Sequence, residues 1–178
     1  MRNIREFYGK KPQIADSVFV DESATVIGDV EIGEDSSIWP QVSVRGDLLK
    51  ITIGKKSNIQ DCSSLHTAEI PHQSGEGFPL TIGDNVIIGH AAVLHGCDIG
   101  DSCLIGMGAI VLDGAIIESE VMVGAGSLVP PGKRLESGYM YLGSPVKQIR
   151  PLTDKEKKGI VANAENYVLT KNRYKQEA

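Results

Sequence analysis

The sequence predicts an all-β solenoid, in which short parallel strands stack into coils, followed by a C-terminal α-helix. Three observations lead to this fold class. Aliphatic residues recur at steps of six, glycine often follows them directly, and small residues often lie four places after them. Because only 5% of the residues are aromatic, a regular stack of Ile, Val and Leu must fill the core in place of aromatic rings.

The six-residue repeat extends from Ile14 to Val129. The aliphatic side chain at each repeat position is expected to point inward, while the small residue lets the corner of the coil close. Three hexapeptides complete one triangular coil, and each coil buries its edge against the next. The eighteen repeat positions, which predict about six coils, are Ile14, Val20, Val26, Ile32, Ile38, Val44, Ile53, Ile59, Leu65, Ile82, Ile88, Leu94, Ile99, Ile105, Val111, Ile117, Val123 and Val129.

The repeat divides the chain into three parts. We expect an N-terminal segment over residues 1–13, the solenoid over residues 14–132 and a C-terminal segment over residues 133–178. The solenoid is expected to end at the run Pro130-Pro131-Gly132, which follows the last repeat position.

The C-terminal segment contains one predicted helix, from about residue 154 to residue 171. Thr153 and Glu156 have the spacing of a capping box, in which each side chain accepts a hydrogen bond from the other residue's backbone N–H. Ile160, Ala164 and Tyr167 then recur at helical spacing. This pattern indicates a helix that lies against the solenoid.

The repeat is interrupted at residues 46–50 and again at residues 68–80. Loops that leave a rigid scaffold often carry functional residues. We therefore treat both interruptions as candidate parts of a site, with an insertion that has no role as the alternative interpretation.

Charge and composition argue against several classes of protein. A nucleic-acid-binding surface needs a basic face to neutralise phosphates, whereas the formal net charge here is -5. No stretch approaches the roughly 18 apolar residues of a membrane span, and no apolar leader follows Met1, so we expect a cytoplasmic protein. The three cysteines form no CxxC pair, which favours reduced thiols over a thiolate metal site.

The repeat places three of the four histidines. His66 and His95 each follow an inward leucine by one place, on the same face of successive coils. Strands in adjacent coils lie roughly 4.8 Å apart, so both imidazoles can reach one metal ion. His90 points across a corner instead. A threefold trimer would bring His90 of one subunit to His66 and His95 of the next, and three imidazoles would leave one metal position open.

The same arithmetic places charged residues one coil lower. Arg45 lies below His66, and Asp61 lies below His90. If the histidines meet across a subunit boundary, Arg45 and Asp61 should also meet there, as a guanidinium–carboxylate pair that fixes the register. A lone surface histidine usually only forms hydrogen bonds, but the shared register of three histidines favours a metal site.

Short runs around the histidines form a pattern that covers the chain from about Phe19 to the C-terminal helix. They are Arg45-Gly46-Asp47, Asn58-Ile59-Gln60-Asp61, Leu65-His66, Gly89-His90, Leu94-His95-Gly96-Cys97, Ile105-Gly106-Met107-Gly108-Ala109 and Leu142-Gly143-Ser144-Pro145. Together they resemble the γ-class carbonic anhydrases. The resemblance implies a left-handed parallel β-helix and a homotrimer with metal sites at the subunit interfaces.

The resemblance also implies the metal and the reaction. Zinc, or alternatively iron or cobalt, would be bound by His66, His90 and His95. The substrate would be carbon dioxide or bicarbonate, interconverted by attack of a metal-bound hydroxide on the carbon atom.

Further residues would support this chemistry by resemblance to the family. Gln60 would orient the hydroxide or a bicarbonate oxygen. Arg45, Asp47 and Asp61 would form the supporting shell of the metal site, and Tyr167 on the helix would reach the pocket.

The sequence departs from the best-studied type of this family at its proton-export residues. A glutamate of the family is replaced by Leu48, and no acidic loop follows Ile51. Glu69 and His72 are the candidate substitutes for the proton shuttle. Without a shuttle, regeneration of the hydroxide would limit turnover.

Three other functions share this scaffold or this site. A hexapeptide acyltransferase uses a histidine as general base and does not need three converging histidines. A thioesterase would use the same metal hydroxide on another substrate. A metal-binding or assembly protein would keep the scaffold without turnover, an interpretation that Leu48 favours.

Overall fold

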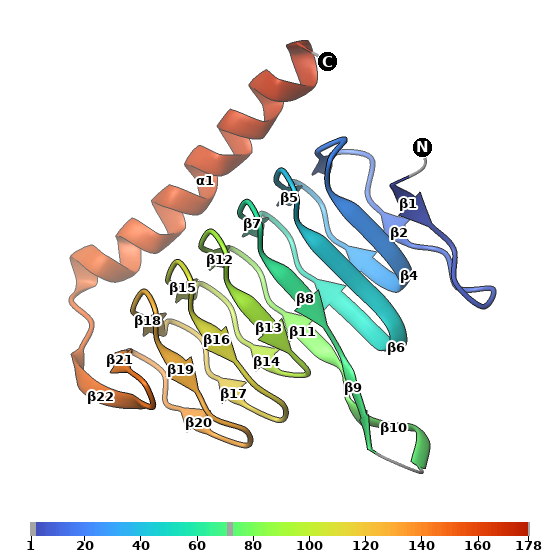
Figure 1. Ribbon diagram of the computed structural model, residues 1–178. Helices are drawn as coiled ribbons and strands as arrows, with labels where there is room; N and C mark the ends of the chain where they lie inside the picture. The colour runs from blue at the N-terminus through green and yellow to red at the C-terminus, as the bar shows by residue number, and fades with distance from the viewer. Residues whose placement is uncertain (1–2, 71–72, 178) are drawn as a thin grey trace.

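The computed structural model describes residues 3–70 and 73–177. The chain forms a left-handed parallel β-helix of about seven turns, with one α-helix at its C-terminal end (Figure 1). Three flat faces, which we call A, B and C in chain order, make a triangular prism.

Each face is a stack of parallel strands. Face A contains β1 (Ile4–Arg5), the first halves of β4 (Thr25–Ile32) and β6 (Ser43–Ile53), β8 (Ser64–His66), β13 (Val93–His95), β16 (Ile110–Val111) and β19 (Leu128–Val129). Face B contains β2 (Gln13–Ile14), the second halves of β4 and β6, β11 (Leu80–Ile82), β14 (Asp98–Ile99), β17 (Ile116–Ile117) and β20 (Arg134–Leu135). Face C contains β3 (Phe19–Val20), β5 (Ser37–Ile38), β7 (Asn58–Ile59), β12 (Ile87–Ile88), β15 (Leu104–Ile105), β18 (Met122–Val123) and β21 (Tyr139–Gly143), with antiparallel β22 (Val146–Pro151) at its edge.

The repeat positions form the core, as predicted. Every repeat position from Val26 to Val129 is buried, while Ile14 and Val20 near the end of the stack are half-buried. Pairing keeps the inward residues in register, so that Leu65 lies between Val44 of the coil below and Leu94 of the coil above. Burial of these aliphatic side chains is the main force that stabilises the stack.

Small residues allow the corners to close, and several are serines whose hydroxyls satisfy the turning backbone. The Ser57 hydroxyl donates to the carbonyl of Gly83 across 2.7 Å, and the Ser63 hydroxyl donates to the carbonyl of Gly89 across 3.0 Å. Because buried carbonyls need a donor, serine serves these positions better than an aliphatic residue would.

The solenoid extends beyond both predicted ends. β1 and β2 pair in parallel with β4, so the segment 1–13 already contributes to the first turn. At the other end, Leu135 and Tyr141 continue the six-residue spacing after Val129 and are buried. The Pro130-Pro131-Gly132 run forms a corner, not a stop, since a corner tolerates residues that would end a strand. The stack therefore continues past residue 132 and has about seven turns.

The first interruption of the repeat, residues 46–50, is not a loop. It lies within β6, which pairs with β4 through an irregular step between Gly28 and Val30. The second interruption forms the antiparallel hairpin of β9 (Ala68–Ile70) and β10 (Gln73–Phe78), which projects from the prism (Figure 1).

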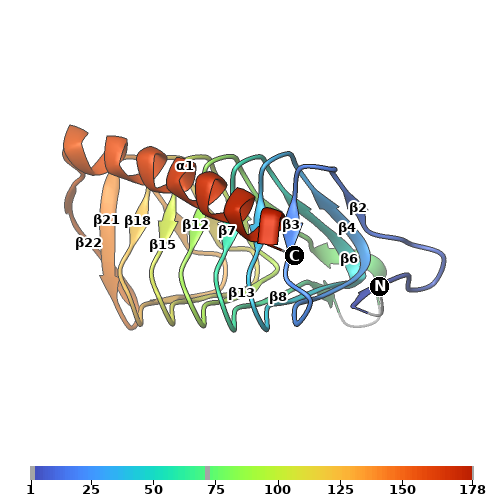
Figure 2. The ribbon, with the colours of Figure 1, turned by 90° about the horizontal axis from the view of Figure 1, so that it is seen from above.

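Helix α1 (Asp154–Glu177) runs along face C, across most turns of the prism (Figure 2). The capping box forms as predicted: the Glu156 carboxylate accepts from the Thr153 N–H across 2.9 Å, and Thr153 Oγ1 accepts from the Glu156 N–H across 3.3 Å. Within the described residues, α1 does not have the apolar length needed to cross a membrane. The helix ends at Glu177, later than residue 171, and both Lys171 and Lys175 contact the prism.

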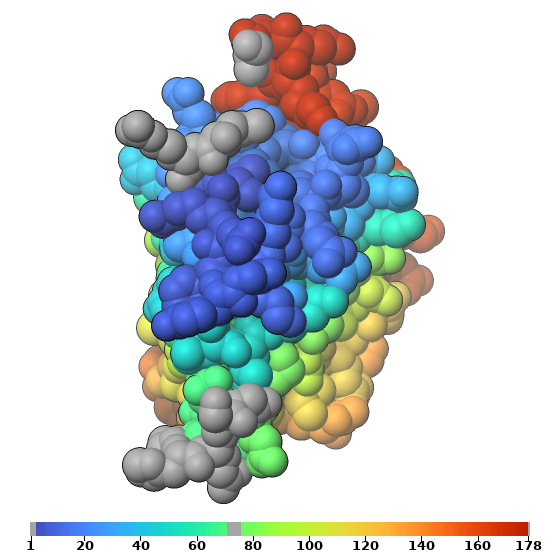
Figure 3. Space-filling view, turned by 90° about the vertical axis from the view of Figure 1, so that its right-hand side faces the viewer, coloured from blue at the N-terminus to red at the C-terminus, as the bar shows by residue number. Residues whose placement is uncertain are grey.

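The first turns of the prism hold the C-terminal half of α1. Lys171 Nζ donates to the carbonyl of Ser17 across 2.8 Å and to Asp35 across 3.0 Å. Rings from the prism and the helix also pack together here, with the Trp39 centroid 5.7 Å from that of Tyr167 and 5.2 Å from that of Tyr174. Figure 3 shows this end of the molecule, where the N-terminal residues cover the end of the stack.

Candidate metal centre

His66 and His95 face each other on face A. Each follows an inward leucine at the end of a short strand, β8 or β13, and the two histidines are paired in register. His66 Nδ1 lies 3.1 Å from His95 Nε2. The predicted stacking of these two imidazoles is therefore present in a single chain.

The other nitrogen of each ring meets a carboxylate. His66 Nε2 lies 2.9 Å from Asp47 Oδ1, and His95 Nδ1 lies 2.5 Å from Asp113 Oδ1. A carboxylate only accepts hydrogen bonds, so each ring nitrogen that contacts one carries a hydrogen. Two neutral imidazoles then turn nitrogen lone pairs toward each other, an arrangement that a metal cation between them would stabilise.

Charge around Asp47 keeps the carboxylate ionised. Burial raises its pKa, but the hydrogen bonds from Arg45 and His66 outweigh that effect and leave the pKa below its usual value. Arg45 Nη1 contacts the second carboxylate oxygen of Asp47 at 2.5 Å. For His66, burial lowers the pKa below 6.5 despite the hydrogen bond to Asp47. The neutral ring, which can bind a metal, is thus favoured at His66.

His90 lies at the corner between faces C and A and belongs to a separate group. Its Nδ1 lies 2.9 Å from Asp61 Oδ2, and the strands that precede the two residues pair in register, as predicted. Burial, and then the charge of Asp61, raise the pKa of Tyr167 on α1, so this tyrosine lies close enough to the corner to sense the Asp61 carboxylate. The helix therefore reaches the His90 side of the site.

Gln60 lies beside Asp61 and is almost fully buried. Its Nε2 donates to Oδ1 of Asn58 across 3.0 Å. The Asn58 side chain is also buried, and its Nδ2 has no hydrogen-bond partner among the described residues. A buried amide without a partner costs roughly 1–3 kcal/mol, so Asn58 is suited to meet a group that comes from outside this chain.

One chain does not gather all three predicted ligands. In the described ranges 3–70 and 73–177, no group of three or more His, Cys, Asp or Glu side chains is arranged to hold a metal. The ligand set His66, His90 and His95 stays a prediction that requires a second subunit. Arg45 pairs with Asp47 of its own chain here, so its predicted contact with Asp61 across an interface also stays a prediction.

The candidate shuttle residues lie in or near the hairpin. Glu69 is half-buried in β9, and His72 lies outside the described residues. Leu48, the apolar residue directly after Asp47, is 44% exposed within β6.

The cysteines do not supply further ligands. Cys97 and Cys103 are buried, and burial raises the pKa of both thiols, that of Cys103 to about 12. A protonated thiol is a poor metal ligand. All three cysteines are free thiols in the structure.

Asp113 is not among the residues singled out from the sequence, and Asn58 appears there only within a motif, without an assigned role. Asp113 lies eighteen residues after His95, which is one full coil, so counting one coil upward from the histidine would have found it. Asn58 stands two places before Gln60 on the same outward side of its strand, and this alternation also predicts their proximity.

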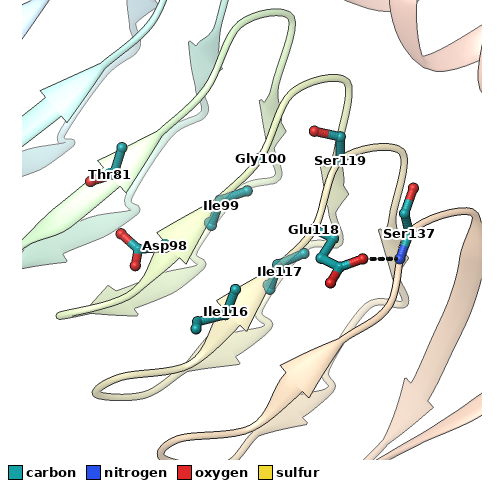
Figure 4. A pocket seen from close by; sticks show the side chains of 9 residues that line it. All are labelled: Thr81, Asp98, Ile99, Gly100, Ile116, Ile117, Glu118, Ser119 and Ser137. Carbon is teal, nitrogen blue, oxygen red and sulfur yellow. Dashed lines mark hydrogen bonds between the residues drawn. The ribbon is translucent and has the colours of Figure 1, made fainter.

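A shallow groove on face B is separate from these residues (Figure 4). No predicted site residue lines it. The lining residues are Thr81, Asp98, Ile99, Gly100, Ile116, Ile117, Glu118, Ser119 and Ser137.

Comparisons with known proteins agree with the fold. Residues 96–131 match the family described as bacterial transferase hexapeptide (six repeats). Protein YrdA of Escherichia coli K12 is 55% identical over 171 residues, 96% of this chain and 93% of that protein. A carbonic anhydrase of Geobacillus kaustophilus is 45% identical over 151 residues, 85% of this chain and 79% of that protein.

A solved structure of a similar protein shows the same fold. The crystal structure of a hexapeptide transferase family protein from Anaplasma phagocytophilum has a TM-score of 0.90 and 37% identity, covering 98% of this chain and 99% of that one. Hexapeptide repeats, a shared β-helix and carbonic anhydrase relatives of similar length lead to one assignment. This chain belongs to the γ-carbonic-anhydrase-like family of hexapeptide-repeat proteins.

Proposed function

We propose that this protein is a trimeric, metal-dependent hydratase that interconverts carbon dioxide and bicarbonate. One observation carries the proposal. In His66 and His95, the ring nitrogen that contacts a carboxylate carries the hydrogen, so the two nitrogens that face each other have free lone pairs. Histidine ligands of metals commonly donate their second ring N–H to a carboxylate or carbonyl. Both rings follow this pattern, and His90 follows it through Asp61.

The donor set fits zinc. Ligand nitrogens of a tetrahedral zinc ion, each about 2.0–2.1 Å from the metal, lie about 3.3 Å from one another. The separation of His66 Nδ1 and His95 Nε2 is 3.1 Å. Three neutral imidazoles also suit iron or cobalt. When bound, such a metal acts as a Lewis acid that lowers the pKa of a water molecule to about 7.

The residues of the chain would then position the reactants. Gln60 donates through Nε2 to Asn58, so the side-chain oxygen of Gln60 can accept a hydrogen bond from water or from the O–H of bicarbonate. The unpartnered Nδ2 of Asn58 can donate to a substrate oxygen. Arg45 holds Asp47 in place, and Asp47 in turn fixes the ring of His66.

A trimer supplies the third ligand in this proposal. His90 lies before strand β13 of face A, whereas His95 ends that strand beside His66. A neighbouring subunit must therefore contribute His90 to the metal site formed by His66 and His95. Outward residues of face A include the exposed side chains of Val93 and Ile110, which are paired in register. Burial of such apolar residues would favour contact between copies of this face.

Zinc loading followed by a carbon dioxide hydration assay tests the proposal. We expect the zinc-loaded protein to hydrate carbon dioxide faster than buffer alone, and the metal-free protein and His66→Ala not to do so. Because Leu48 replaces the acidic residue of the family, the rate should rise with the concentration of imidazole buffer, which can carry the proton. Stoichiometric zinc binding without any hydration would favour the non-catalytic function, and absence of zinc binding would refute the metal site.

Two alternative activities can be measured with the same preparations. A hexapeptide acyltransferase would transfer the acyl group of an acyl-coenzyme A to a hydroxyl or amine acceptor, and release coenzyme A, without added metal. A metal-dependent thioesterase would release coenzyme A only when zinc is bound. Transfer that persists in His66→Ala and in metal-free protein would favour the acyltransferase.

A further inference from the structure

We propose that Asp113 is a positioning residue that fixes the ring of His95 for metal binding. The inference rests on the proposed function and deepens it, because it assigns a role to a residue that the family pattern in the sequence did not single out. Asp113 Oδ1 lies 2.5 Å from His95 Nδ1 and would not contact the metal, since the opposite nitrogen of the ring faces His66.

The hydrogen bond fixes one tautomer of the ring. Asp113 accepts from His95 Nδ1–H, so the lone pair remains on Nε2, which is the nitrogen that faces His66. A charged acceptor also makes the imidazole a stronger ligand. Every predicted ligand then has its own carboxylate partner: Asp47 for His66, Asp61 for His90 and Asp113 for His95.

The backbone around Asp113 is held from below and above. The N–H of Gly114 donates to the carbonyl of Gly96 across 2.7 Å, and the N–H of Gly132 donates to the carbonyl of Asp113 across 2.8 Å. Gly96 follows His95 directly, and its own N–H donates to the carbonyl of His66 across 2.9 Å. The two histidines and Asp113 are therefore joined by one ladder of hydrogen bonds at the corner between faces A and B.

Phe78, the last residue of β10, packs onto this corner. A Cβ atom at Gly96 would lie 2.6 Å from Phe78 Cβ, and one at Gly114 would lie 2.9 Å from Phe78 Cε1. Only glycine at these two positions leaves room for the ring. The base of the hairpin thus covers the backbone next to Asp113 and His95, which reduces the freedom of the carboxylate to turn away.

Zinc affinity and NMR of the histidine rings test this role together. We expect Asp113→Asn and Asp113→Ala to weaken zinc binding by about 10–100-fold, as measured by competition with a chromophoric chelator. In the zinc-loaded wild type, the Nδ1 proton of His95 should resonate far downfield and exchange slowly; this signal should move upfield in Asp113→Asn and disappear in Asp113→Ala. Asp98→Asn, which changes an exposed aspartate on face B, is the matched control and should leave both readouts unchanged.

The outcomes separate this inference from the proposed function. Wild-type zinc affinity and an unchanged His95 signal in both Asp113 variants would overturn the positioning role, even if the enzyme is active. A lowered melting temperature with an unchanged signal would indicate a purely structural role and would also overturn it. If the wild type binds no zinc, the proposed function fails, and the tautomer of His95 in metal-free protein still decides whether Asp113 fixes the ring.

Discussion

His66 Nδ1 and His95 Nε2 lie 3.1 Å apart. A neutral imidazole has a single N–H, and in both rings this N–H donates to a carboxylate. Two lone pairs at this distance repel each other unless a positive charge lies between them. Burial lowers the pKa of His66 and so disfavours a proton at this position, which leaves a metal ion as the better partner of the two nitrogens and puts protons in competition with it. This relationship explains why pH, folding and metal binding are expected to be linked in this protein.

The stability of the metal-free protein should fall as the pH drops below 6.5. Burial lowers the pKa of His66 in the folded state, so the unfolded state binds more protons between that lowered pKa and 6.5. The free energy of unfolding should then decrease on acidification through this window, by at most about 1.4 kcal/mol per pH unit for one group. Urea unfolding from pH 7.5 to 5 measures this slope.

The variant His66→Gln provides the comparison for the pH prediction, because it removes the titrating ring. Its unfolding free energy should depend less on pH in the same window. Asp47 does not interfere, since its pKa is lowered from 3.8 and its contribution is lost only at more acidic pH. Equal slopes for the wild type and His66→Gln would rule out a role for His66 in this pH dependence.

Replacing Gly96 by alanine should destabilise the protein by more than about 1 kcal/mol. Gly96 has a φ of 51°, and an added Cβ would lie 2.6 Å from the Cβ of Phe78. Gly126→Ala is a suitable control, because Gly126 has a φ of 65° but no heavy atom within 4 Å of an added Cβ. Thermal unfolding should show the larger loss for Gly96→Ala; equal losses would mean that packing against Phe78 contributes nothing.

Removing the Lys171 side chain should loosen the C-terminal half of α1. Lys171 is buried and donates to Ser17 and Asp35, and a hydrogen bond to a charged group contributes about 1.5–3 kcal/mol. We expect Lys171→Ala to lower the melting temperature and to increase hydrogen exchange of the amides near the end of α1. Lys158→Ala, at an exposed helix position, should change neither, and similar exchange in both variants would contradict the prediction.

The sequence was sufficient to predict the prism and its register, because a repeat of six depends only on which residues point inward. That arithmetic correctly placed His66 beside His95 and Asp61 beside His90. The six-residue spacing also continues past Val129 to Leu135 and Tyr141, although Pro130-Pro131-Gly132 resembles an end of the repeat. Both belong to a further turn, in which the corner accommodates proline and the core accepts a ring.

Other features depend on contacts between residues far apart in the sequence. Nothing local indicates that Lys171 is buried, since its acceptor Asp35 lies 136 residues away. The packing of Phe78 on Gly96 likewise requires the hairpin to fold back onto the corner. Such tertiary contacts override local propensity, and a pattern read along one chain does not contain them.

The central claim is that each metal site takes His66 and His95 from one subunit and His90 from its neighbour. Mixed trimers test it most directly, with bound zinc measured after co-expression of two variants. His66→Ala mixed with His90→Ala should restore one interface in each mixed trimer, about a quarter of the wild-type zinc for random equal mixing. His66→Ala mixed with His95→Ala should restore none, because both changes affect the same half of the site. Absence of zinc in the first mixture, or equal zinc in the two mixtures, would contradict the shared site.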